Sequence, residues 1–154
     1  MNGIDQIVEL SKEYLNAHNR MNERFKKWNE NKFDVVKSTL NKVREQLINE
    51  NDFFVNNLYV NSDENKTQVS LRAGQTIVPN SEKFEKGFEI NFFQINNGKI
   101  YACYYNNSID KNSISNELFL FDNLEEITEE KVLELVYDGI KKSMKSSFLF
   151  NGDK

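Results

Sequence analysis

The sequence is poor in the residues that build cross-links, zinc sites and nucleophile–base pairs. Its 154 residues include one cysteine and one histidine, so the chain cannot form an internal disulfide, and a zinc site with about four His or Cys ligands is not expected. A Ser–His or Cys–His mechanism would have to use His18, which falls on the apolar stripe of a predicted helix. Cys103 stands in an aromatic segment with no base beside it. We therefore expect a protein that is not an enzyme and has no metal and no cofactor.

Proline, glycine and long apolar runs are also scarce. One proline and six glycines exclude a collagen-like or linker-dominated chain, and no apolar run approaches the roughly 20 residues that cross a bilayer. The first ten residues lack a basic segment and include Asp5 and Glu9, unlike a secretory signal peptide. The composition, with 38% hydrophobic and 29% charged residues, is typical of a folded domain. We expect one domain over 1–154, located in the cytoplasm.

The first 50 residues show a helical apolar period. Apolar side chains recur at three- and four-residue steps from Ile4 to Trp28, with Ser11 and His18 in the same stripe, and again from Phe33 to Leu47. Either one helix of some 45 residues forms, or the helix breaks near 29–31 and folds back as a hairpin with Asn31 or Asp34 as the second N-cap. We favour the break, because a single long helix would leave its stripe in water unless a partner covered it. The near-heptad stripe also suggests a homodimer through the N-terminal helix.

Residues 51–122 have the alternation and the aromatic and β-branched side chains of strands. Strands are expected over 53–60, 67–78, 87–96, 99–106 and 117–121. Asn97-Gly98 predicts a two-residue hairpin turn that places Ile95 opposite Ile100, and this register makes both sheet faces apolar. We therefore predict that other elements cover each face.

A C-terminal helix is predicted over 127–148. Thr128 suits the N-cap, Ile127 and Val132 stand at staple positions, and a stripe that includes Met144 and Phe148 is expected to be buried. The predicted fold class is α+β, an antiparallel meander of about five strands packed by two N-terminal helices and one C-terminal helix. The helical segment (1–50), the meander (51–122) and the last helix form a single domain.

Charge is unevenly distributed along the chain, whose net charge is −4. Between Arg20 and Arg44 eight basic residues face three acidic ones, a net of +5, and between Glu117 and Asp138 eight acidic residues face one lysine, a net of −7. The overall acidity makes direct nucleic-acid binding an unlikely function, since such domains are usually basic.

These features favour two functions, whereas an enzyme that uses carboxylates and a divalent metal is permitted by the sequence but no residue pattern points to it. The first is a protein that masks another protein with a basic surface, as an inhibitor or an immunity protein of a nuclease does; mobile elements often encode such proteins. Its contact residues would be the acidic row Glu126, Glu130, Glu134 and Asp138, with Arg20, Arg24 and Lys27 as the second candidate surface. The alternative is a small-molecule-binding domain with an aromatic pocket between sheet and helices, lined by Phe88, Phe92, Tyr101 and Tyr105.

Overall fold

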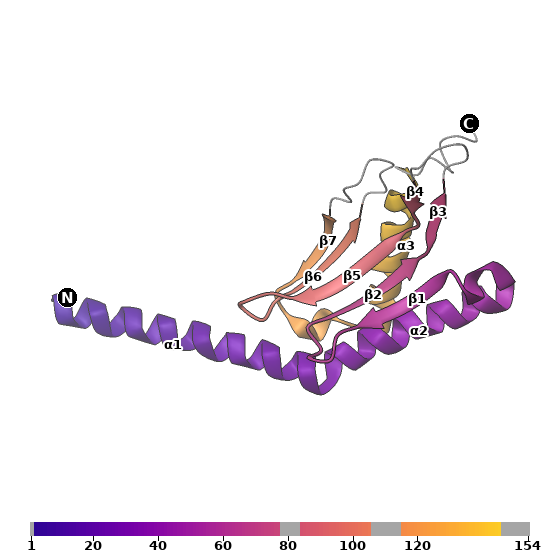
Figure 1. Cartoon of the computed structure of the whole chain (residues 1–154). Helices are drawn as coiled ribbons and strands as arrows, with labels where there is room; N and C mark the ends of the chain where they lie inside the picture. Colours follow the sequence, from indigo (N-terminus) through magenta and orange to yellow (C-terminus); the bar gives the residue numbers. More distant parts are fainter. Residues whose placement is uncertain (1, 78–83, 106–114, 146–154) are drawn as a thin grey trace.

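A computed structural model describes residues 2–77, 84–105 and 115–145 of the chain and shows an α+β fold (Figure 1). The N-terminal helical part consists of α1 (Gly3–Lys27), a π-helical turn η1 (Trp28–Lys32) and α2 (Phe33–Glu50). A five-stranded antiparallel sheet and the C-terminal helix α3 (Glu129–Lys145) follow. The predicted fold class, an antiparallel meander packed by helices from both ends of the chain, is confirmed.

The two N-terminal helices join through η1 instead of folding back. Figure 1 shows α1 and α2 as one bent rod, with α1 projecting away from the sheet. The irregularity lies where the sequence suggested it, but the predicted hairpin is wrong, and so are Asn31 and Asp34 as N-caps, because the N-cap of α2 is Lys32 in helical conformation. The cause is a five-residue step between Trp28 and Phe33. A π turn absorbs one extra residue, and the Phe33 amide donates to the Trp28 carbonyl, so both rings are buried.

The main sheet has the strand order β1-β2-β5-β6-β7, and each neighbouring pair is antiparallel. Its strands are β1 (Leu58–Ser62), β2 (Gln68–Ala73), β5 (Glu89–Gln94), β6 (Ile100–Tyr105) and β7 (Ser115–Phe121). Between β2 and β5 the chain forms a separate two-stranded pair, β3 (Gln75–Ile77) with β4 (Phe84–Lys86). Two details of the expected strands are wrong. Residues 52–55 form a 3-10 turn instead of the start of β1, and the β4 segment was not predicted as a strand.

The β5–β6 hairpin forms as predicted, but its register differs by one residue. Gln94, and not Ile95, lies opposite Ile100. The Ile95 amide donates to the Lys99 carbonyl, and Gly98 has φ +84°. Three residues therefore form the loop, and the left-handed glycine produces the bulge typical of such loops. Because a one-residue slip exchanges the faces, Phe92 shares a face with Ala102, while Phe93 and Tyr101 lie on the other.

Helices α2 and α3 contact each other and pack against the same face of the sheet. The core between them includes Val36 and Leu40 of α2, Phe92 of β5 and Val132 of α3, all fully buried. The opposite face carries Ser70, Arg72 and Glu89 beside aromatic side chains of β5 and β6. The helices that the structure describes thus cover one face of the sheet, whereas the sequence predicted that other elements cover both.

Helix α3 begins as the sequence predicts. The Lys131 amide donates to the Thr128 hydroxyl at 3.1 Å, and Ile127 and Val132 are fully buried at the staple positions. Met144, which was predicted to be buried, is 38% exposed, and Phe148 lies outside the described residues. Across the described ranges, no helix combines the length and apolarity needed to span a membrane.

Candidate functional site

The acidic row occupies the outer side of α3 and of the turn before it. Val132, Leu135 and Val136 fix the opposite side of α3 against the sheet, so Glu130 and Glu134 are exposed, as is Glu126 in the preceding 3-10 turn η3 (Leu124–Glu126). Asp138 is half-buried and forms an ion pair with Lys142 at 3.0 Å, and Glu134 lies 3.6 Å from Lys131. Helical spacing thus places Glu130, Glu134 and Asp138 along one side of α3, and Glu126 is exposed just before the helix.

Apolar side chains stand beside this row, and sequence reasoning missed them. Leu133, Tyr137 and Met144 are 42%, 69% and 38% exposed. Tyr137 and Met144 line an open hollow of about 340 Å³ together with Ile140, Lys141 and Lys145. Leu133 and Tyr137 lie four residues apart and outside the buried stripe, so their spacing could have placed them on the exposed face. We call Glu130, Glu134, Asp138, Leu133, Tyr137 and Met144 the α3 surface.

Three other acids of the −7 segment form ion pairs within the molecule. Glu125 lies 3.1 Å from Lys27 and 3.9 Å from Lys32, Glu129 lies 3.0 Å from Lys42, and Asp122 lies 2.6 Å from Lys99. The basic N-terminal helices and the acidic segment therefore neutralise each other where they meet. The hydrogen bond from Lys27, and then the charges of Lys27 and Lys32, hold the pKa of Glu125 below its usual value.

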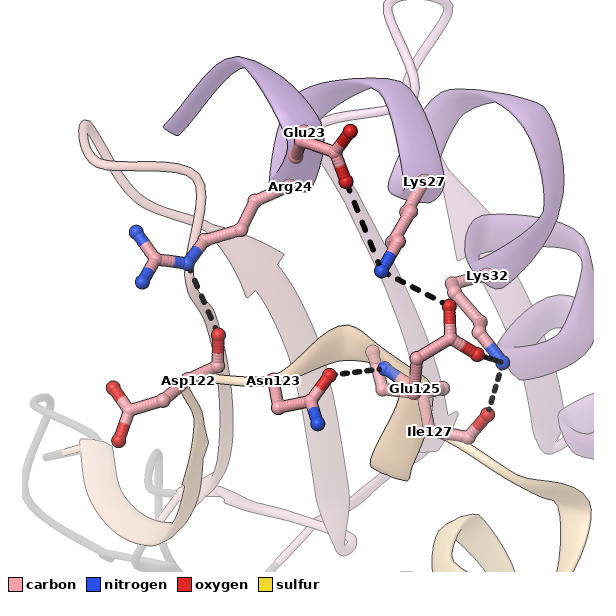
Figure 2. A network of polar contacts seen from close by, with 8 residues as sticks. All are labelled: Glu23, Arg24, Lys27, Lys32, Asp122, Asn123, Glu125 and Ile127. Carbon is pink, nitrogen blue, oxygen red and sulfur yellow. Dashed lines mark hydrogen bonds and ion pairs between the residues drawn. The ribbon is translucent and has the colours of Figure 1, made fainter. Parts of the chain in front are cut away.

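Figure 2 shows this junction, where the basic side chains of α1 and η1 contact the connection between β7 and α3. Arg24 Nε donates to the Asp122 carbonyl at 3.0 Å, and Arg24 also donates to the Asn97 carbonyl at 3.2 Å. Lys32 donates to the Ile127 carbonyl at 3.1 Å. Of the second candidate surface, Arg24 and Lys27 thus hold α1 on the domain, and Arg20 is exposed on the projecting part of the helix. The structure does bring all three together around one open hollow of about 490 Å³, which Asp122 and Asn123 also line.

His18 and Cys103 belong to different elements, α1 and β6. His18 is exposed on α1, where its ring stacks on Tyr14 at 6.3 Å between centroids. Cys103 is 4% exposed in β6, and its burial, followed by the charge of Glu89, raises its pKa to about 11. The thiol is therefore protonated at neutral pH. Within the described ranges, no three His, Cys, Asp or Glu side chains cluster as a metal site would require.

The four aromatic residues of the alternative function do not line a common cavity. Phe92 is fully buried in the helix-facing core, and Phe88 packs against the same core. Tyr101 and Tyr105 belong to the opposite face of the sheet, because they alternate with the core-facing Ala102 along β6.

Comparison with known proteins adds no relationship: no family, curated protein or solved structure gives a significant match to the chain.

Proposed function

We propose that this protein is a non-enzymatic binding domain that masks a basic surface of another protein, with the α3 surface as its contact. The observation that carries the proposal is that Glu130 and Glu134 are exposed on α3 beside Tyr137, with Glu134 paired to Lys131 of its own helix. Glu125 and Glu129, in contrast, form ion pairs with lysines of the N-terminal helical part. Acids that are not needed to hold the helices together remain available to a partner.

The apolar part of the α3 surface supplies an anchor for binding, which a row of charged side chains alone lacks. Protein interfaces combine a few anchors, often Tyr, with charges at the rim that speed association. Tyr137 at 69% exposure next to the 340 Å³ hollow provides such an anchor. Lys141 and Lys145 border the hollow, so the partner's basic groups are expected opposite Glu130 and Glu134, at the N-terminal half of α3.

A partner that handles nucleic acid fits this chemistry, because such proteins present basic surfaces to phosphates. Covering that surface would inhibit the partner by excluding its substrate. The proposed protein is therefore of the inhibitor or immunity type.

The test is to capture a partner with the tagged chain, identify it, and reconstitute the complex from the two purified proteins. The variant Glu130→Lys, Glu134→Lys, Asp138→Lys should lower the association rate at least tenfold at low salt and flatten its salt dependence. Tyr137→Ala should mainly raise the dissociation rate, by about tenfold. In the complex, the partner should also lose its activity on nucleic acid.

A charge-matched control is available on other exposed acids. Glu45→Lys, Glu50→Lys, Glu64→Lys makes the same change in net charge at exposed residues outside α3 and should leave the association rate within about twofold. Equal rates for the α3 variant and the wild type would show that the α3 surface is not the contact. A partner that keeps full activity in the complex would contradict the masking function.

A further inference from the structure

The first 18 residues of α1 are exposed along their whole length. Only the last part of this segment borders other described elements, across open hollows that Tyr14, His18 and Arg20 line with residues of the β5–β6 loop and of the β7–α3 connection. Every residue from Gly3 to Arg20 is exposed, whereas Trp28 at the end of the same stripe is fully buried. Several large apolar side chains are left in water: Ile4 at 73%, Ile7 at 66%, Val8 at 45%, Leu10 at 64%, Tyr14 at 74% and Leu15 at 56% exposure. Figure 1 shows this part of α1 extending clear of the sheet. We call residues 3–20 the free arm.

An isolated helix of this length is marginal in water, because most helical stability in proteins comes from packing of the apolar stripe. The start of the arm is well formed, with the Asn2 side chain accepting from the Asp5 amide at 2.9 Å. A single cap and one Lys12–Glu9 ion pair at 3.2 Å, both exposed, contribute little. The stripe therefore needs a covering surface.

We propose that this surface is the free arm of a second copy of the chain, and that the two arms pair antiparallel with Ser11 at the two-fold axis. The spacing of the stripe supports this arrangement. Ile7 and Leu15 lie four residues to either side of Ser11, Val8 and Tyr14 lie three to either side, and Ile4 and His18 lie seven to either side. A two-fold axis at Ser11 would place Ile7 opposite the partner's Leu15, Val8 opposite the partner's Tyr14, and Ile4 opposite the partner's His18.

The position of Ser11 in the arm also fits. The arm spans residues 3–20, so its midpoint lies beside Ser11, and a crossing there lets the two arms overlap along their whole exposed length. The small serine side chain allows the helices to approach closely at the axis. The domains would then sit at opposite ends of the paired helices, because α1 joins the sheet only beyond the arm (Figure 1).

Charge favours the antiparallel orientation over the parallel one. The half before Ser11 carries Asp5 and Glu9, a net of −2, and the half after it carries Lys12, Glu13 and Arg20, a net of +1. Antiparallel pairing sets each acidic half against a basic half, and it also opposes the two helix dipoles. Parallel pairing would set the −2 halves together and stack His18 on His18.

The charge of the arm also argues against a membrane surface as the occupant. Helices that lie on membranes have Lys- and Arg-rich polar faces. Here three acids face two bases over the whole arm, so anionic lipid would repel it.

The first experiment is sedimentation equilibrium of the full chain over about 1 to 200 µM. We expect a species of twice the 18.1 kDa chain mass. Ile7→Asp with Leu15→Asp should raise the dimer dissociation constant at least about a hundredfold, whereas Gln6→Asp with Asn16→Asp adds the same charge on the other side of the helix and should leave it within a few-fold. A monomeric wild type, or equal dimerisation of both variants, overturns the proposal.

The second experiment tests orientation and does not depend on a destabilised variant. Chains with Ile4→Cys and chains with His18→Cys, one of them tagged, are mixed and mildly oxidised, and the unsubstituted chain reports any background from the buried Cys103. The antiparallel pair predicts a mixed disulfide between the two kinds of chain. Disulfides only between identical chains would show parallel pairing and overturn the arrangement, and absence of all cross-links would overturn the dimer.

Discussion

The two halves of the N-terminal helical rod have nearly the same apolar period and opposite environments. In α2, Val36 and Leu40 are fully buried against the sheet, whereas in the free arm Ile4 and Ile7 are 73% and 66% exposed. Both halves are regular helices of high polar content. An apolar stripe therefore predicts that a surface is needed but does not say whether the same chain supplies it.

The environment of the helical rod changes at η1, where the rod contacts the rest of the domain. Trp28 is buried, its Nε1 donates to the Lys66 carbonyl at 2.6 Å, and its ring meets Phe33 edge-on at 5.5 Å. One turn earlier, Arg24 bonds two loop carbonyls. Beyond these contacts α1 leaves the sheet, so the junction fixes the direction of the arm.

The largest expected effect is a loss of stability on substitution of Trp28, where the packed half of the helical rod begins. Trp28→Ala removes a fully buried indole and leaves the Lys66 carbonyl without its donor, so it should lower the free energy of unfolding by about 3–5 kcal/mol. Ile7→Ala in the arm should change it by less than about 0.5 kcal/mol when the chain is dilute enough to be monomeric. Urea denaturation followed by circular dichroism measures both. A large loss for Ile7→Ala would show that the arm packs on its own domain.

A smaller effect concerns the polar contacts at the base of the arm. Arg24→Met keeps most of the aliphatic stem but removes the donors to the Asp122 and Asn97 carbonyls, which should cost about 1–2 kcal/mol. Arg20→Met, one turn earlier on the exposed arm, makes the same charge change and serves as the control. Thermal unfolding of the two variants decides whether Arg24 anchors the helix. Equal melting temperatures would contradict that role.

The sequence predicts most elements of this fold because their signals are local. Thr128 starts α3 through its own side chain, and Asn97-Gly98 produces the hairpin through the positive φ of Gly98. Two predictions that are wrong each depend on a shift of one residue, which local sequence patterns do not resolve. A five-residue step was interpreted as a break, although a π turn accommodates it, and a three-residue loop shifted the hairpin register by one.

The candidate site was less accessible to sequence reasoning, because it depends on which charges meet in space. Nothing in the spacing of Glu125 and Glu129 indicates that they pair with Lys27 and Lys42, about a hundred residues earlier. Helical geometry alone does place Glu130, Glu134 and Asp138 in one row. The same geometry places Tyr137 on the exposed side of α3, because it lies outside the buried stripe of Val132, Leu135 and Val136.

The smallest expected effect is a loosening of the junction in acid. Hydrogen bonding and charge from Lys27 hold the pKa of Glu125 below its ordinary 4.5, and the hydrogen bond from Lys99 holds that of Asp122 below 3.8. A carboxyl with a lowered pKa in the folded state stabilises that state above its unfolded pKa, and the contribution is lost as pH falls through the folded pKa. The contribution should therefore be complete at neutral pH, begin to fall near pH 4.5, and vanish below the folded pKa values. Both side chains are solvent-exposed, so the loss of stability should be modest.

Fluorescence of Trp28, the only tryptophan, and melting temperatures from pH 7 to pH 3 would measure this loss of stability. Glu125→Gln should lower the neutral-pH melting temperature slightly and reduce its fall in acid, whereas Glu9→Gln, which breaks an ion pair on the free arm, should leave the acid response of the domain unchanged. An unaltered pH profile in Glu125→Gln would show that this ion pair does not hold α1 to the domain.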